Sequence, residues 1–331
     1  MIRRPPRSTH CISSAASDVY KRQISITSDS DNNTVGGTNA GNVGTWSGAS
    51  DNTCFGSNAG TDLTNADGNT LIGKGAGENF TSGGLNTAIG YIALRDATTQ
   101  ICNTAVGAYA LQQCTRNENT AVGYQAGKNA TNIIDTTLMG YRAGYSLTDG
   151  EYNTFIGWQA GESMQTGDRN TAVGRGALDN CVSGNNNTCL GLDAGMNTTA
   201  SDNVMIGCNA GRTNTTGNSN VYIGTYVADQ GTDGSRNVCV GMYAMSSGVS
   251  SYNTLIGWAA GHSITSNGNY NTCLGYGAGY HISSGTRNTC IGHEAGYNQL
   301  STDSNELWIC LLYTSDAADD MQCVDLGGRR I

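Results

Sequence analysis

A short repeat governs most of the sequence. The nine residues NTFIGWQAG at 153–161 recur with small changes from near residue 52 to near residue 305. With the leading Asn as position 0, the units start at 52, 69, 86, 103, 119, 136 (where Thr replaces Asn), 153, 170, 187, 203, 220, 237, 253, 271 and 288. The spacing is 16 to 18 residues, most often 17. A period this short predicts a solenoid, because each coil can bury its apolar face only against its neighbours.

Three positions of the repeat have a structural meaning. Position 4 is Gly in every coil, which fits a corner where the backbone needs a positive φ or a close approach. Position 7 is Ala except at Val227, so two walls of a thin coil can pack closely. The Asn at position 0 recurs at the spacing of neighbouring strands and therefore predicts a ladder of side-chain amides that satisfies the backbone groups of a turn.

Positions 2 and 3 are both apolar, although neighbouring residues of a strand point to opposite faces. We expect position 3, which is apolar throughout, to form the core: Phe55, Ile72, Ile89, Val106, Val122, Met139, Ile156, Val173, Leu190, Ile206, Ile223, Val240, Ile256, Leu274 and Ile291. Position 2 mixes small and large residues: Cys54, Leu71, Ala88, Ala105, Ala121, Leu138, Phe155, Ala172, Cys189, Met205, Tyr222, Cys239, Leu255, Cys273 and Cys290. A coil has one inside, so we expect position 2 to meet another chain. The alternative is that its small residues tolerate solvent.

Both ends of the sequence match translated sequencing-adapter DNA. Residues 13–23 match a transposon-type adapter and residues 1–9 the primer that precedes it, whereas 310–319 and 323–331 match the reverse complements of the same segments. The barcodes encoded by 10–12 and 320–323 also agree. Such segments are excluded from fold reasoning. We expect 1–23 to be foreign and disordered, 24–51 to be degenerate first coils, 52–309 to be a solenoid truncated at both ends, and 310–331 to be foreign. The alternative for the N-terminal segment is a basic targeting peptide.

Composition argues against several classes of protein. The native part holds 10 basic and 21 acidic residues, so its net charge of −11 disfavours nucleic acid, which needs clustered Lys and Arg. It holds no proline, as expected where nearly every backbone N–H joins a ladder. No apolar stretch is long enough to cross a bilayer, so we expect no membrane insertion of this fragment.

We expect no catalytic residues, no cofactor and no metal. Five of the nine native cysteines share position 2 with Ala and Leu, which is typical of Cys used as a small apolar residue in a reducing compartment. Cys273, His281, Cys290 and His293 follow the coil period and not a zinc-ligand spacing. No Ser/His/Asp set, carboxylate pair or phosphate loop stands apart from the repeat. The protein is therefore not expected to be an enzyme.

One set of variable residues is a candidate ligand-binding ridge. Position 5 carries Tyr91, Tyr124, Tyr141, Trp158, Trp258 and Tyr276, and the neighbouring position 6 carries Tyr109, Tyr226 and Tyr243. Aromatic side chains with polar tips can stack on sugar rings or bases. The alternative, which the pattern favours, is stacking between coils that stabilises the edge of the solenoid.

The units NTAVGYQAG at 119–127 and NTFIGWQAG at 153–161 resemble the head repeats of trimeric autotransporter adhesins of the YadA type. They resemble still more closely the repeats of phage and giant-virus tail-fibre proteins. The resemblance covers almost all of 52–309 and implies an all-β fold, a parallel β-solenoid (left-handed β-roll) that we expect to have about 16 coils and to form a homotrimer. The period is longer than the shorter repeat of the adhesin heads, and neither a membrane anchor nor a chaperone domain is present in this fragment.

The resemblance implies a shaft or head segment of a virion tail fibre that contributes to binding a cell-surface glycan or protein receptor. One alternative is a bacterial trimeric surface adhesin. Another is an ice-binding solenoid, which the Thr at position 1 of most coils suggests. The ice-binding hypothesis is weakened by Val204, Val221 and Val238 in that column and by the lack of paired Thr ranks.

Overall fold

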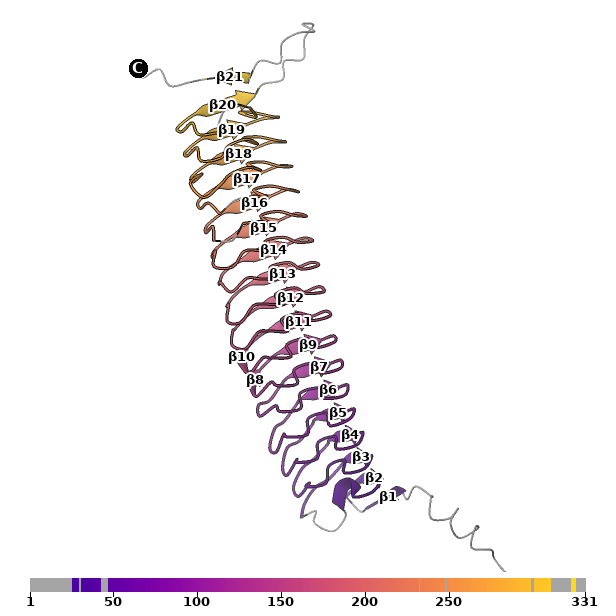
Figure 1. Ribbon diagram of the computed structural model, residues 1–331. Coiled ribbons are helices and arrows are strands. Elements are labelled where there is room, and N and C mark those ends of the chain that lie inside the picture. The colour runs from indigo at the N-terminus through magenta and orange to yellow at the C-terminus, as the bar shows by residue number, and fades with distance from the viewer. Residues whose placement is uncertain are drawn as a thin grey trace, which may run out of the picture.

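The protein is an all-β parallel β-solenoid whose coils stack into one long column (Figure 1). The computed structural model describes residues 26–29, 31–42, 47–231, 233–247, 249–298, 301–310 and 323–325. A sheet of 19 strands follows the column, and all of them pair in parallel except the two end strands β1 and β21, which pair antiparallel. About 16 coils with a spacing of about 17 residues result, as the repeat predicted.

The strands of the large sheet are short, and all except the end strands β1 and β21 occupy positions 1 to 3 of the repeat. They are β1 (Ile26–Ser28), β2 (Thr34–Gly36), β3 (Thr53–Phe55), β4 (Thr70–Ile72), β5 (Thr87–Ile89), β6 (Thr104–Val106), β7 (Thr120–Val122), β9 (Thr137–Met139), β11 (Thr154–Ile156), β12 (Thr171–Val173), β13 (Thr188–Leu190), β14 (Val204–Ile206), β15 (Val221–Ile223), β16 (Val238–Val240), β17 (Thr254–Ile256), β18 (Thr272–Leu274), β19 (Thr289–Ile291), β20 (Leu307–Cys310) and β21 (Cys323–Asp325). A short 3-10 helix, η1 (Ala40–Asn42), follows β2. Strands β8 (Asn132–Ile134) and β10 (Asp149–Glu151) pair in parallel in a second small sheet.

The terminal segments are only partly described. Residues 1–23, predicted to be foreign, lie outside the described residues, as do most of 310–331. Strand β2 pairs in parallel with β3, so the degenerate coil before residue 52 belongs to the same column. At the other end, β21 pairs antiparallel with β20, in a register that places Trp308 opposite Asp325 and Ile309 opposite Val324.

The register keeps equivalent residues of successive coils side by side. Phe155 pairs with Ala172, and Ile156 pairs with Val173, in the parallel ladder between β11 and β12. Units of 16, 17 and 18 residues all keep this register, because the length differences fall in the loops that follow position 8. The columns read from the sequence are therefore columns in space.

The prediction of which strand face is inside was wrong. Position 2 forms the core: Cys54, Leu71, Phe155 and their equivalents are at most 2% exposed. Position 3, expected to be the core, faces outward, and Ile72, Met139 and Leu274 are 39%, 41% and 46% exposed. The physical reason is the Asn at position 0, which is buried in a hydrogen-bonded ladder and therefore turns position 2, on the same side of the strand, inward.

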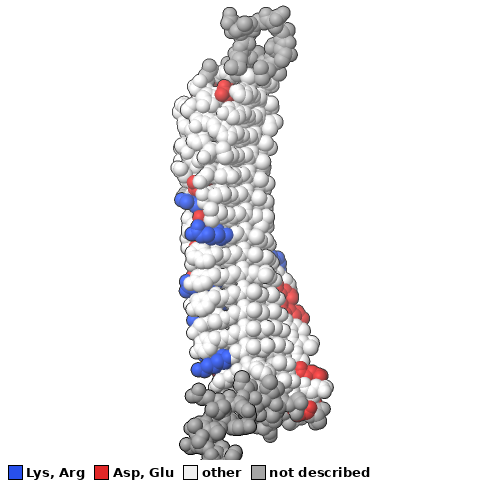
Figure 2. All heavy atoms as spheres, turned by 90° about the vertical axis from the view of Figure 1, so that its right-hand side faces the viewer, with Lys and Arg blue, Asp and Glu red and all other residues white. Residues whose placement is uncertain are grey.

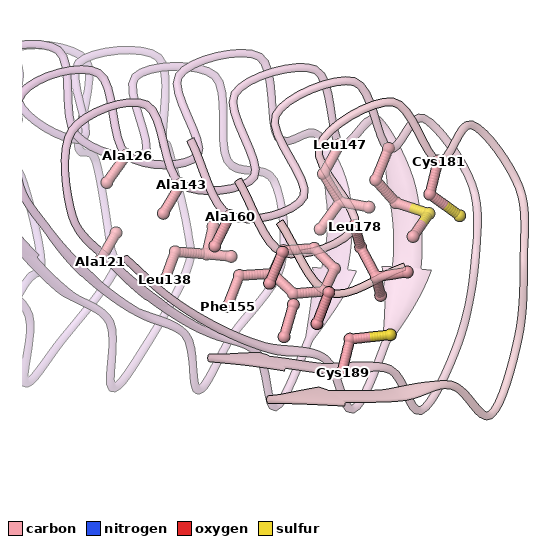
Figure 3. Close-up of a cluster of buried hydrophobic side chains, with 14 of the residues drawn as sticks. Ala121, Ala126, Leu138, Ala143, Leu147, Phe155, Ala160, Leu178, Cys181 and Cys189 are labelled. Carbon is pink, nitrogen blue, oxygen red and sulfur yellow. The ribbon is translucent and has the colours of Figure 1, made fainter. Parts of the chain in front are cut away.

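Three columns of side chains fill the inside of the coil (Figure 3). Position 2 packs against the alanines of position 7, such as Ala143 and Ala160, which are fully buried as the sequence predicted. Position 11, with Leu147 and Cys181, completes the core. Because these cores are thin, a single large side chain per coil fills much of the space.

Position 8 compensates for the size of position 2. Where position 2 is Phe155, position 8 is Gly161, and a Cβ added to Gly161 would meet the Phe155 ring at 2.7 Å. Where position 2 is Ala172, position 8 is Leu178, which is fully buried and adopts a positive φ of 53°. These two coils thus fill similar volumes, as close packing demands. The coil of Ala121 and Gly127 is an exception, because Leu111 and Leu138 of the adjoining coils lie against Gly127 instead.

The Asn ladder and the Gly corner are both confirmed. The Oδ1 of Asn153 accepts bonds from the backbone N–H of Asn170 at 3.0 Å and from its Nδ2 at 3.2 Å, while that Nδ2 also donates to the carbonyl of Gly184 at 2.8 Å. Gly157 at the corner has φ of 143°, and an added Cβ would lie 2.3 Å from the carbonyl oxygen of Gly174. Only Gly fits this approach of successive coils.

Candidate functional site

The outer face of the strand stack is an uncharged surface with a long apolar stripe. Positions 1 and 3 both project from this face, and no charged residue occupies either position from Thr53 to Ile291. Ile256 in this stripe is 38% exposed and Ile291 is also 38% exposed. Figure 2 shows a side of the column where uncharged residues cover most of the surface and where Lys and Arg gather along one margin. This apolar stripe is therefore a candidate interaction site.

The predicted aromatic ridge is present as two stacked ladders. In the first, rings of successive coils contact one another in the order Tyr91, Tyr109, Tyr124, Tyr141 and Trp158. The first two contacts are edge-to-face, at 5.3 and 6.0 Å between ring centroids, and the next two are stacked, at 5.6 and 6.0 Å. Position 6 takes part through Tyr109, so the ladder draws on both positions.

The second ladder runs through the C-terminal coils. It comprises Tyr226, Tyr243, Trp258, Tyr276 and His293, with ring centroids 5.6, 6.4, 4.6 and 5.1 Å apart in that order. Trp258 and Tyr276 form the closest stacked pair of this ladder. The six predicted ridge residues therefore divide between two separate ladders and do not form one continuous site.

The geometry limits how these ladders can hold a ligand. The Trp158 ring lies between Tyr141 and the guanidinium of Arg175, whose Cζ is 5.1 Å from the ring centroid. Neighbouring side chains thus occupy the ring faces, and the ring edges and tyrosine hydroxyls remain at the surface, with Tyr141 and Trp158 41% and 44% exposed. A ligand would be held through hydrogen bonds to these polar tips, and receptor binding by the ridge stays a prediction.

A second aromatic column lies on the opposite edge of the strand, at position −1, directly before the Asn. Tyr252 and Tyr270 stack at 4.9 Å, with Arg287 5.8 Å from the Tyr270 ring. Arg236 donates a hydrogen bond to the Tyr252 hydroxyl at 2.7 Å. Sequence reasoning missed this column, although the fixed offset of its members from the Asn was readable. The outer face is therefore bordered by aromatic and cationic residues on both edges.

One open depression lies on the N-terminal coils. It has a volume of about 380 Å³ and is lined by Asp51, Asp67, Leu85, Ile101 and four other residues. Asp67 is already engaged, since its Oδ1 accepts bonds from the backbone N–H and the hydroxyl of Ser50. The depression combines exposed apolar side chains with carboxylates but holds no reactive group.

The ionisable groups of the core are inert. Burial raises the pKa of the Cys54 thiol to about 12 and that of the Cys114 thiol to about 11, so both remain protonated and are poor nucleophiles. Burial, helped by Glu162 and Asp193, also raises the pKa of Asp179 to about 6. Arg142 pairs with Glu162 at 2.6 Å. These shifts follow from the stacking of coils and do not converge on a cleft.

Cys273, His281, Cys290 and His293 do not come together as a zinc site. Cys273 and Cys290 lie side by side in the core, whereas His293 stacks on Tyr276 and His281 packs edge-on to Tyr297 outside it. Among the described residues, no group of three or more His, Cys, Asp or Glu side chains is placed to hold a metal ion. In the same part of the chain, no helix has the length and apolar character needed to cross a bilayer.

Comparison with protein-family models, curated proteins and solved structures found no match to this chain. The proposed function therefore rests on the repeat architecture and on the outer face of the strand stack.

Proposed function

We propose that this chain is a shaft or head segment of a fibre in which three copies associate through positions 1 and 3 of the strand stack. The observation that carries the proposal is the uncharged outer face, which repeats in every coil and places an apolar side chain at position 3 each time. The number three comes from the resemblance of the repeat to trimeric fibre proteins. A virion tail fibre is the favoured setting, and a bacterial surface adhesin is the alternative.

The area of this face suits a stable association. The flat part of the strand, repeated at about 4.8 Å per coil over the column, covers roughly 900 Å² per chain. Specific interfaces bury about 800 Å² per partner. Burial in a trimer would remove the apolar stripe from water and leave the aromatic ladders at the margins of the interface, where they can contribute to contact with a glycan or protein receptor.

The test of assembly is the mass of the purified chain by light scattering. We expect three times the chain mass of 34.4 kDa. Ile256→Asp should yield monomers, because a single substitution places three carboxylates around the trimer axis. Val182→Asp is the matched control, since Val182 is 40% exposed, close to the 38% of Ile256, but lies outside the strand stack. A monomeric parent chain, or a trimer that survives Ile256→Asp, would contradict the proposal.

The receptor-binding part of the proposal has a separate test. Tyr124→Phe and Tyr141→Phe together remove two hydroxyls but keep the stacked rings 5.6 Å apart. On an array of cell-surface glycans, we expect the parent trimer to bind and this double variant to bind more weakly. Equal binding by the two proteins would show that the ridge is not the contact, and no binding by either would point to a protein receptor.

Ice binding remains a second candidate because of one structural finding. Position 1, mostly Thr, and position 3, always apolar, lie on the same flat face, so the sheet does carry two parallel ranks, one of Thr and one apolar. The second rank is apolar, so the paired Thr ranks that the sequence lacks are still missing. Thermal hysteresis by the purified chain, together with a monomeric mass, would favour ice binding over the fibre. Its absence from a trimer would exclude ice binding.

A further inference from the structure

We propose that the two edges of the outer face meet between neighbouring chains, position 5 of one chain lying against position −1 of the next at the same coil level. The inference rests on the proposed trimer and adds its geometry: the chains are parallel, in register and joined by three identical seams. The partner is thus a second copy of this chain, and the residues that choose it are those of the two edges.

The fold places both positions at the borders of the face. The residue before each Asn adopts a left-handed backbone, with φ of 59° at Tyr152 and 63° at Tyr252. The Gly at position 4 also has positive φ, as in Gly157 at 143°. The chain therefore turns at both ends of every strand, and positions −1 and 5 stand at the two corners, roughly 15 to 20 Å apart for an extended segment of this length.

In seven coils the two edges match in size. All three tyrosines of position −1 lie in coils that also carry Trp or Tyr at position 5; the pairs are Tyr152 with Trp158, Tyr252 with Trp258, and Tyr270 with Tyr276. In contrast, coils with a small residue at position 5 have a short one at position −1; these pairs are Asp51 with Ser57, Cys102 with Ala108, Asp202 with Cys208, and Ser219 with Thr225. These seven coils pair large residues with large ones or small residues with small ones, whereas Gly68 with Lys74 and Asp135 with Tyr141 do not.

Contacts within one chain do not explain this match. Among the described residues, ring contacts run along each column, such as Tyr141 to Trp158 and Tyr252 to Tyr270, and none joins position −1 to position 5. The edges are also open to solvent, since Leu85 is 68% and Tyr270 52% exposed. A size relation across the full width of a strand therefore points to a contact supplied by another chain.

Symmetry then sets the register. A closed three-fold arrangement has no translation along its axis, so each coil meets the same coil of its neighbours. Around the axis, the position 5 edge of one face meets the position −1 edge of the next. The one coil with a cation at both edges avoids a direct clash of charge, because Arg169 lies over Tyr152 at 5.7 Å and Arg175 over Trp158 at 5.1 Å within each chain.

Disulfide trapping tests the seam in the full chain with Cys11, Cys310 and Cys323 replaced by Ser. Cys102 is exposed at position −1, and Ala108 is the position 5 residue of the same coil. We expect Ala108→Cys to give a covalent trimer on mild oxidation with copper phenanthroline, seen on a denaturing gel without reductant. The native pair Cys102 and Cys208 lies six coils apart, so the parent chain should stay monomeric on that gel.

The control is Cys102→Ser combined with Ala108→Cys, which leaves one edge without a thiol and should abolish the covalent trimer. Cross-linking in this control, or in the parent, would overturn the in-register seam. A light-scattering trimer whose Ala108→Cys variant forms no covalent trimer would overturn the seam alone and leave the proposed function standing. A monomeric parent chain would overturn both.

Discussion

Phe155 and Ile156 are neighbours in one strand, yet they belong to regions that follow different rules. On the inner side, position 2 varies from Ala to Phe, and position 8 or a side chain of an adjoining coil, as at Gly127, fills the space that a small residue leaves. On the outer side, position 3 varies little from Ile72 to Ile291, and only the first described coil, where the Phe55 ring covers Gly36, shows a compensating pair among the described residues. The comparison teaches that size variation with compensation is typical of a core, whereas an exposed column of uniform apolar character is the basis of the proposed contact between chains.

The largest loss of stability should follow from removing the large core side chain of one coil. Phe155→Ala removes a fully buried ring and should lower the free energy of unfolding by about 3–5 kcal/mol. Urea unfolding followed by circular dichroism measures this loss. A loss below that expected for a surface residue would mean that position 2 is not the core.

Compensation can be tested in the same coil. Gly161→Leu alone should cost about 1–3 kcal/mol by overpacking, since its Cβ would lie 2.7 Å from the Phe155 ring. Combined with Phe155→Ala, it recreates the Ala172 and Leu178 arrangement of the next coil and should recover part of the lost stability. Additive losses in a double-mutant cycle would show that the two positions do not share one volume.

Removing one amide from the buried Asn ladder should also lower the free energy of unfolding. Asn170→Ala leaves the backbone N–H of Asn187 without its acceptor at 3.0 Å and should cost about 1–3 kcal/mol. Asn180→Ala is the control, because Asn180 donates to Asn197 at 2.8 Å in an exposed pair with the same coil spacing. Equal effects on the urea midpoint would contradict a special role for the buried ladder.

The effect of a substitution at position 3 on stability should depend on protein concentration. Ile156→Ala should cost less than about 1.5 kcal/mol in dissociated chains, because the side chain is already partly exposed. In an assembled fibre the cost should grow with concentration, since association stabilises only the folded chain. A cost that is independent of concentration would argue against an interface at position 3.

The smallest effect concerns pH. The folded pKa of Asp179 is raised to about 6 from an ordinary value of 3.8, so the folded chain holds this proton more tightly than the unfolded chain. Stability from this group is therefore fully present below about pH 4 and falls as pH rises toward 6. Asp179→Asn should remove that part of the pH dependence of the urea midpoint. An unchanged pH profile would contradict the burial of this carboxyl group.

The repeat alone predicted much of the fold, including the solenoid, the Gly corner, the buried Ala and the Asn ladder. It did not predict which side of the strand is inside, because alternation states only that positions 2 and 3 face opposite ways. Asn153 determines which side is inside, because a buried amide at position 0 places position 2 on the same, inner side. The sequence predicted which residues form the aromatic ridge. It did not predict stacking such as that of Tyr141 on Trp158, because stacking depends on the distance between coils in space.

Between Asn52 and Asn288, one level of the column lacks the amide of the Asn ladder. Thr136 replaces the amide there; its N–H donates to Asn119, and its hydroxyl donates within its own coil to Ile134. The Thr136 coil also carries β10, which pairs with β8 of the preceding coil. Under tension or torsion applied along the column, a stack of identical coils would share the strain evenly. The Thr136 coil differs, because it lacks an Asn side chain to bond the next coil on one side and has the extra β8–β10 pairing on another. Mechanical load should therefore concentrate at this level, as a bend with a defined direction.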